Sequence, residues 1–290
     1  MPKRERQPPG SALLWILALL VMLGSAVWQR QTGPTHPQKG EVEIAGQTVP
    51  YKLLRSGTSG EALRVTVGAP PEVTGTIRWR RYPTEEPFGA LTILRDGDVL
   101  VGLLPTQPPA GKLEYQLVLA GSFGLARIPA DEPVVMRFKD SVPAWALIPH
   151  ILIIFLAMLV GVRTGFAALF GRPETKRFAQ ITLGGITVGG MILGPVVQKY
   201  AFGAFWTGWP FGYDLTDNKT LVMFVAWLVA VLVLAYAQSQ KDRFARTVVV
   251  MATVVMIAVY LVPHSLRGSQ LDYDKLEAGE SAHDAIGTGR

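Results

Sequence analysis

Five long stretches of almost uninterrupted apolar residues divide this chain, and each is long enough to cross a membrane. They run at about 11–28, 143–162, 178–198, 220–237 and 247–262. A helix of about 17–25 apolar residues spans the ~30 Å hydrocarbon core of a bilayer. The pattern therefore predicts a membrane α-helical protein with five transmembrane helices, the last four forming a bundle over residues 143–263.

Between residues 30 and 142 the pattern changes to short runs in which apolar and polar residues alternate, separated by Gly, Pro and Asp. Alternation with a period of two is typical of strands that bury one face. About seven such strands in about 100 residues predict an all-β sandwich domain. We expect Trp79 and Tyr115 in its core, and Arg78, Arg80 and Arg81 on a solvated strand face.

Composition agrees with a membrane protein, because 49% of the 290 residues are hydrophobic and only 17% are charged. The chain has no cysteine, which excludes disulfides, cysteine-ligated zinc and covalent c-type haem attachment. Much of the formal net charge of +6 lies beside the apolar stretches. It therefore predicts membrane topology, with lipid as a partner, and gives no support for nucleic-acid binding.

The basic residues predict an orientation, since Lys and Arg gather on the cytoplasmic side of membrane proteins. They precede the first stretch and lie between the second and third and between the fourth and fifth. We therefore expect a bacterial cytoplasmic-membrane protein with its N-terminus inside. The β-domain, the loop 199–219 and the acidic tail 264–290, which we expect to be largely disordered, would then lie outside.

The first stretch has two interpretations. Residues 1–29 form either a retained anchor helix or a secretory signal peptide, since small residues allow a cleavage site after Ala26. Either one exports the domain that follows.

The loop 199–219 is the most unusual segment, because YAFGAFWTGWPFGY contains seven aromatic residues within fourteen. An aromatic belt at the membrane interface explains one or two residues at a helix end. Seven in a loop broken by Gly and Pro predict a folded interfacial lid. The polar residues that follow are expected to cap the next helix through Asp214 or Thr216, with Asp217 and Asn218 in its first turn or just before it; a calcium site is the alternative.

Two histidines lie near the same predicted side of the membrane as this loop. His150 is about two turns into the second stretch, and His264 follows the fifth. Neutral imidazoles are ligands for haem iron, and two facing helices could supply one each. The alternative is a hydrogen-bonded packing residue at His150 and an interfacial polar residue at His264.

The third stretch carries glycines at four-residue spacing, at 185, 189, 190 and 194. Small faces of this kind let another backbone, or a flat cofactor, approach closely, and tight helix packing is the favoured interpretation. Pro195 is expected to break or kink this helix and so to begin the aromatic loop. The predicted spans contain no deep acidic residue, which argues against a carboxylate proton relay.

Residues 202–233 resemble the tryptophan-rich WWD segment of membrane proteins that handle haem in cytochrome c maturation. FGAFW (Phe202–Trp206) is similar to its first half, and DLTDNKTLVMFVAWLV is similar to its polar and helical part. Phe202 replaces the leading Trp, and the interval from Trp206 to Asp214 is longer than in the family. The resemblance implies b-type haem at the outer leaflet, with His150 and His264 as axial ligands. It implies further cofactor contacts from the loop, namely Phe205, Trp206, Trp209, Tyr213 and Asp214.

Residues 41–140 resemble an immunoglobulin-like or fibronectin type III domain. Trp79 in IRWRR occupies the third-strand position, and Tyr115 in PPAGKLEYQLVL occupies that of the tyrosine-corner residue. This resemblance implies a fold and not a function.

Three functions are consistent with these features. The first is a haem-binding membrane protein for haem handling or electron transfer with a periplasmic partner. The second is a non-catalytic assembly subunit whose β-domain docks a protein partner, and the third is a quinone-binding protein. The sequence has no GxSxG, HExxH, Walker A or Rossmann motif, so it gives no support for an enzyme.

Overall fold

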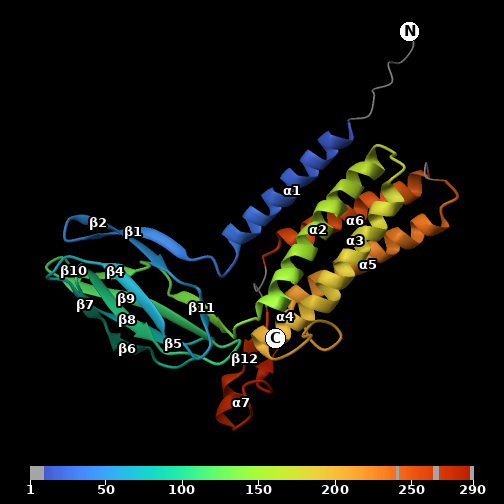
Figure 1. The fold of residues 1–290 in the computed structure, drawn as a ribbon. Helices are drawn as coiled ribbons and strands as arrows, with labels where there is room; N and C mark the ends of the chain where they lie inside the picture. The colour runs from blue at the N-terminus through green and yellow to red at the C-terminus, as the bar shows by residue number, and fades with distance from the viewer. Residues whose placement is uncertain (1–9, 240–241, 264–267, 288–290) are drawn as a thin grey trace. The chain divides into compact units, whose positions relative to one another are not determined.

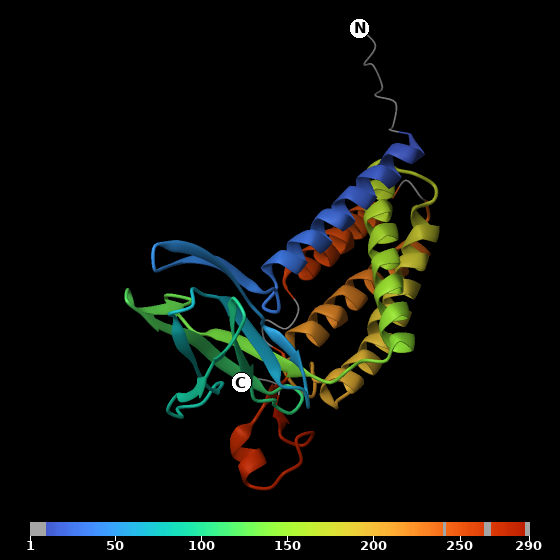
Figure 2. The same ribbon diagram turned by 60° about the vertical axis from the view of Figure 1, so that its left-hand side comes forward.

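The computed structural model describes residues 10–239, 242–263 and 268–287. The chain divides into two compact units (Figures 1 and 2). The helical unit comprises residues 1–33, 142–199 and 204–267, and the β-unit comprises residues 34–141, 200–203 and 268–290. Each unit is described by itself below.

Among the described residues, five helical segments are long and apolar enough to cross a membrane, which confirms the predicted number of spans. One span, over residues 175–202, is assembled from three consecutive helical elements. The elements are α1 (Ser11–Thr32), α2 (Ala144–Leu169), α3 (Thr175–Gly185), η1 (Ile186–Leu193), α4 (Gly194–Phe202), α5 (Leu215–Tyr236) and α6 (Arg243–Leu261).

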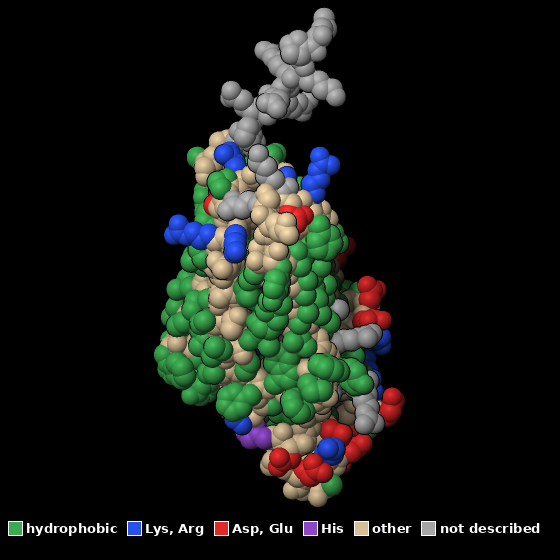
Figure 3. All heavy atoms as spheres, turned by 90° about the vertical axis from the view of Figure 1, so that its right-hand side faces the viewer, with side chains coloured by type: hydrophobic (Ala, Val, Ile, Leu, Met, Phe, Trp, Pro, Cys, Tyr) green, Lys and Arg blue, Asp and Glu red, His purple; other side chains and the backbone are tan. Residues whose placement is uncertain are grey.

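The five spans pack around a shared apolar core, and α1 contributes to it. Ala18 and Met22 of α1 are buried together with Met158 of α2, Trp227 of α5 and Met256 of α6. Large apolar residues on the other faces of the helices stay exposed, and Figure 3 shows hydrophobic side chains covering the outside of the helices. Lys and Arg side chains gather near the end at which the chain begins (Figure 3). An apolar exterior of this kind is expected where lipid is the solvent.

Glycines bring α3 and η1 close to α2 and α5, which confirms the tight-packing interpretation. A side-chain carbon at Gly185 would lie 2.8 Å from Cβ of Ala157, and one at Gly190 would lie 2.9 Å from Cγ2 of Thr220. The segment η1 is π-helical, so its turns are wider than those of an α-helix, and it leads directly into α4. The expectation for Pro195 was wrong in part, because the helix continues past it to Phe202. The helix is continuous at this point, since the amide of Gly194, the residue before Pro195, donates to the Gly189 carbonyl.

The β-unit is built from short strands in several open sheets. A six-stranded sheet has the order β3-β11-β9-β5-β6, with β10 paired to β9, and a three-stranded sheet has the order β4-β8-β7. β1 and β2 form a hairpin, and β3 pairs with β11 in parallel. The strands are β1 (Gln38–Ile44), β2 (Gln47–Leu53), β3 (Ser56–Thr58), β4 (Leu63–Gly68), β5 (Thr74–Arg81), β6 (Gly89–Thr92), β7 (Leu94–Asp96), β8 (Val99–Leu104), β9 (Lys112–Gly121), β10 (Gly124–Ile128) and β11 (Val134–Lys139).

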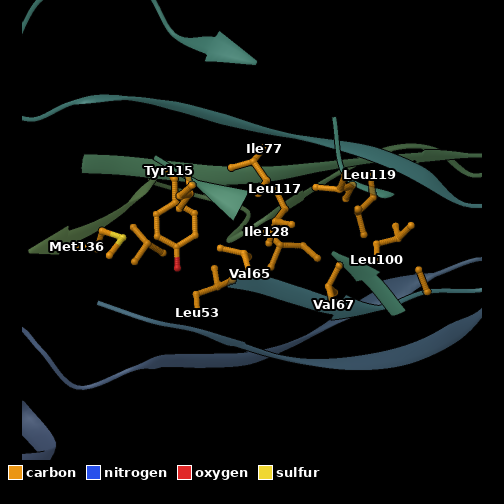
Figure 4. Close-up of a cluster of buried hydrophobic side chains, with 14 of the residues drawn as sticks. Leu53, Val65, Val67, Ile77, Leu100, Tyr115, Leu117, Leu119, Ile128 and Met136 are labelled. Atoms are coloured by element: carbon orange, nitrogen blue, oxygen red, sulfur yellow. The ribbon is translucent and has the colours of Figure 1, made fainter. Parts of the chain in front are cut away.

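One hydrophobic core joins these sheets (Figure 4). Leu53 and Val65 contribute from β2 and β4, while Ile77 and Leu117 contribute from β5 and β9. Tyr115 is fully buried, as predicted, and its hydroxyl donates to the Leu54 carbonyl at 2.8 Å. Burial raises the pKa of this phenol, so it stays a hydrogen-bond donor. Trp79 is half-buried and packs against the same core.

The three arginines of β5 are not the freely solvated face that we expected. Arg80 pairs with Glu114 across the sheet, and its guanidinium lies 4.5 Å from the ring centroid of Phe88. Arg78 covers the same ring at 4.6 Å. Arg81 pairs with Glu86 and with Glu277. The alternating pattern located the strand, but it could not reveal partners from distant parts of the chain.

The acidic C-terminal segment is folded over residues 268–287, so the expectation of a largely disordered tail was wrong. β12 (Gln270–Leu271) pairs with β13 (Ile286–Gly287), and α7 (Tyr273–Glu277) lies between them. Leu271, Tyr273 and Ala285 form a small apolar core. The Tyr273 hydroxyl donates to the Lys112 carbonyl at 2.8 Å and accepts from the Lys112 amide at 3.0 Å. These contacts hold the segment on β9.

Candidate functional site

A buried polar chain fixes the aromatic loop, which spans residues 203–214 between α4 and α5. The Asp217 carboxylate accepts from the Thr207 amide at 2.6 Å and from the Thr207 hydroxyl at 3.3 Å. The amide group of Gln198 donates to the same hydroxyl at 2.6 Å. Asp217 and Thr207 are both buried. Because buried carboxylates and amides are costly unless paired, this network specifies one loop conformation.

A second set of hydrogen bonds holds the tip of the loop. Asn218 accepts from the Trp209 amide at 2.7 Å, and the Trp206 indole donates to the Trp209 carbonyl at 3.0 Å. Gly208 lies between them, where a side-chain carbon would come within 2.6 Å of Cβ of Asp217. The loop therefore needs glycine at this position to approach α5 so closely.

Two further charged residues of this region satisfy the ends of helices. Asp214 is the N-cap of α5, where its carboxylate accepts from the Thr216 amide at 2.8 Å, which confirms the capping prediction. Lys219 is buried, and its ammonium donates to the Val262 carbonyl at the end of α6. A cation there interacts favourably with the carbonyl end of the helix dipole.

The loop turns four aromatic side chains outward. The exposed fractions are 57% for Phe205, 65% for Trp209, 80% for Phe211 and 72% for Tyr213. Trp206 is half-buried, and the Lys199 ammonium lies 5.7 Å from the ring centroid of Phe205. The loop is thus an ordered support for exposed aromatic rings.

His150 lies in α2 and contacts the π-helical segment η1. Its Nδ1 is 2.8 Å from the Gly189 carbonyl oxygen, so Nδ1 carries the proton and donates. In this tautomer Nε2 keeps its lone pair, as in many metal-bound histidines. Gly194 leaves space beside the ring, since a side-chain carbon there would lie 3.7 Å from Cε1. The hydrogen-bonded packing role considered for His150 is therefore present, and the free Nε2 keeps the ligand role open.

The second candidate ligand, His264, lies outside the described residues, so its separation from His150 is undefined. Within the described parts of the chain, no group of three or more His, Asp or Glu side chains could hold a metal ion. Oxygens of Asp214, Asp217 and Asn218, considered for calcium, instead accept hydrogen bonds from loop and helix amides.

A second buried charge lies in α2 and was not predicted as a site. Arg163 is fully buried, and its Nη2 donates to the Glu174 carboxylate at 2.7 Å and to the Ser11 hydroxyl at 3.3 Å. Its guanidinium lies 5.5 Å from the ring centroid of Trp15 and 5.3 Å from that of Phe178. Nε and Nη1 have no hydrogen-bond partner within the described structure. One arginine thus connects α1, α2 and the start of α3.

The predicted second span ended at Val162 because Arg163 looked like the first residue of a basic connection. The helix in fact continues to Leu169. The signal that was missed is the apolar run TGFAALF directly after Arg163, which places the arginine within the span and not beyond it.

Comparison with known proteins found no family model and no curated protein that matches this chain.

Proposed function

We propose that this protein is a non-catalytic assembly subunit of a membrane complex, and that its aromatic loop contacts a membrane protein partner. The supporting observation is that four exposed rings are carried by a loop fixed through the buried hydrogen bonds between Thr207 and Asp217. Ordering such a loop and burying Asp217 both cost free energy. Trp and Tyr are among the residues that most often anchor protein interfaces. An ordered set of exposed rings is therefore suited to a specific contact.

Site-specific photo-crosslinking in native membranes tests this proposal. A photoreactive phenylalanine analogue at Phe211 should give a protein adduct of discrete mass. The same analogue at Leu232, which is exposed on the apolar surface of α5, is the matched control and should give lipid adducts alone. If Phe211 also gave lipid adducts alone, the loop would be an interfacial belt and the proposal would be wrong.

We further propose that the protein lies in a bacterial cytoplasmic membrane with its β-unit outside. The support is the distribution of basic residues, because Arg172, Lys176 and Arg177 lie between the end of α2 and the first turn of α3, and Arg243 and Arg246 lie in the first turn of α6. The absence of cysteine makes a direct test possible. A membrane-impermeant maleimide applied to intact spheroplasts should label Glu85→Cys in the β-unit and leave Arg177→Cys unlabelled. The reverse result would invert the orientation.

The β-unit is proposed to be related to immunoglobulin-like domains. The support is the buried Tyr115, whose hydroxyl bonds to a backbone carbonyl as a tyrosine corner does. The acceptor is Leu54, which lies much farther upstream than in that motif. A docking role for this unit fits the assembly function.

A second candidate function, b-type haem binding at the outer leaflet, is favoured by the tautomer of His150. With Nδ1 bonded to the Gly189 carbonyl, Nε2 is available to an iron, and the tautomer therefore fits a haem ligand. Haem would supply one-electron chemistry, and His150 would orient it. The exposed rings of the loop fit a partner surface better than an enclosed haem pocket, and we therefore rank this function second.

Absorption spectroscopy of the purified protein separates the two functions. Haem binding requires a Soret band that is lost in His150→Ala and kept in His36→Ala, which removes a histidine of the β-unit. A colourless protein that also fails to take up added haem would eliminate the haem function and leave the assembly function standing.

A further inference from the structure

A groove lies between the end of α2 and the start of α6, at the opposite end of these helices from the aromatic loop. Its volume is about 350 Å³. The residues that line it are Ala168, Leu169, Arg243, Arg246, Thr247, Val250 and Met251. All of them belong to the helical unit, so the groove is formed within one compact body.

Two guanidinium groups, those of Arg243 and Arg246, lie at this groove, and only that of Arg246 is held by hydrogen bonds to α2. Arg246 is fixed by α2, because its Nε and Nη2 donate to the Ala168 and Leu169 carbonyls at 2.6 Å each. Its Nη1 makes no hydrogen bond within the described residues. The Arg243 side chain is exposed, and its guanidinium makes neither a hydrogen bond nor an ion pair within the described residues; its backbone carbonyl accepts from the Thr247 hydroxyl at 2.9 Å. The nearby carboxylate of Asp242 is occupied, since it accepts from the Phe244 and Ala245 amides. The groove thus presents two guanidinium groups that form no ion pair within the described residues.

The lining of the groove becomes less polar along α6, from its first turn toward the middle of the span. Arg246 and Thr247 lie three and four residues after Arg243, and Val250 lies four and three residues after them, so the four residues share one face of α6. The charged pair lies at the helix end, and Val250 and Met251 follow about one turn beyond Arg246, farther into the span. Leu169 and Met251 are exposed apolar residues on the two sides of the groove. A ligand with an anionic head and an apolar tail matches this order.

We propose that this groove binds an anionic phospholipid. The phosphate accepts hydrogen bonds from Arg243 and from Nη1 of Arg246, with Thr247 beside it. An acyl chain lies along Val250, Met251 and Leu169. Basic grooves between transmembrane helices commonly hold anionic head groups in this way. Because Arg246 also bonds to the end of α2, a bound lipid would strengthen the α2–α6 contact. The proposal is independent of the assembly function at the other end of the bundle.

Native mass spectrometry of the full chain in detergent tests the proposal, with phosphatidylglycerol and phosphatidylcholine of identical acyl chains as probes. The wild type should retain phosphatidylglycerol about tenfold better, because both lipids carry the phosphate but phosphatidylcholine adds a choline cation that the two guanidinium groups repel. Arg243→Gln should remove this preference. Thr247→Trp, which fills the groove and leaves both arginines, should remove it too. Arg246 is left unchanged because it also holds α2.

The matched control is Arg177→Gln, which removes one exposed positive charge at the same end of the bundle without lining the groove. It should keep the preference. If Arg177→Gln and Arg243→Gln lost the preference for phosphatidylglycerol equally, the lipid would be attracted by the overall positive charge of this end and not by the groove. That result would overturn the proposal. The last measurement uses glycerol phosphate as a competitor, because it has the phosphate but no acyl chain. If it displaced phosphatidylglycerol at equal concentration, the groove would bind phosphate and not lipid, and the proposal would also fail.

Discussion

Asp217 and Arg163 are both buried charges of the helical unit, but they lie near opposite ends of the spans and have different partners. Asp217 accepts two hydrogen bonds from Thr207, ten residues away in the chain. Arg163 pairs with Glu174 and reaches Ser11 and the ring of Trp15 in another helix. One charge therefore fixes a local loop, whereas the other connects three helical segments. We expect loss of the first to loosen the loop, and loss of the second to weaken the bundle.

The largest effect should follow Glu174→Ala, because it leaves Arg163 buried without a counter-charge. Removing one partner of a buried ion pair costs about 3 kcal/mol or more. Arg163→Met should cost less, since Glu174 is partly exposed and can be solvated. Denaturation in mixed micelles, followed by circular dichroism, gives both values. A larger loss for Arg163→Met would show that the arginine acts through packing and not through its charge.

Asp217→Ala should have the next largest effect, and a local one. It leaves the buried amide and hydroxyl of Thr207 without an acceptor, which costs about 2 kcal/mol. Hydrogen exchange should rise over residues 203–214 and stay unchanged in α1 and α2. Asp217→Asn keeps an acceptor oxygen and is the matched control, with a smaller rise. Faster exchange throughout the bundle would contradict the local role.

Trp15→Leu should weaken the contact of α1 with Arg163 by about 1 kcal/mol, since it replaces a ring face with an aliphatic side chain. Crosslinking between cysteines introduced in α1 and α2 would report the weakened contact. The same packing leads us to expect that α1 remains in the mature protein and is not cleaved after Ala26. The intact mass decides this, and a mass that begins at Val27 would contradict it.

The smallest expected effect is a change in stability at acidic pH. Burial alone would raise the pKa of Glu174, but hydrogen bonds from its own backbone amide and from Arg163 outweigh burial and hold the pKa below its usual 4.5. A carboxyl with a depressed pKa stabilises the fold fully above its unfolded value and loses this contribution as pH falls through the folded value. The stability difference between wild type and Glu174→Gln should therefore shrink below about pH 4.5. A constant difference down to pH 3 would mean that the charge of Glu174 does not matter.

Local and long-range contacts of the aromatic loop differ in how far the sequence predicts them. The N-cap role of Asp214 was predicted because capping is local and depends on residues two positions apart. The partner of Asp217 was not, because its hydrogen bonds depend on how the loop folds back onto α5. The outward direction of the rings at Phe211 and Tyr213 was equally hidden, since composition gives the number of aromatic residues and not their exposure.

The C-terminal segment gives the same lesson in the β-unit. Its acidic composition predicted disorder, yet Leu271, Tyr273 and Ala285 pack together and Tyr273 bonds to Lys112. Glu277 pairs with Arg81, which neutralises part of the charge that suggested disorder. Three apolar residues are too few to form a core alone, and they are held by a surface that lies far away in the chain.

The sequence by itself determined the five membrane spans and the change to strands between the first and second. Both depend on the spacing of apolar residues along one segment, which selects the element that satisfies its own backbone hydrogen bonds and buries one face. Only the tertiary structure decided the partners of Arg163 and Asp217, the direction of the aromatic rings and the order of the C-terminal segment. Each of these depends on contacts between segments that the chain brings together only when it folds, and no local pattern encodes them.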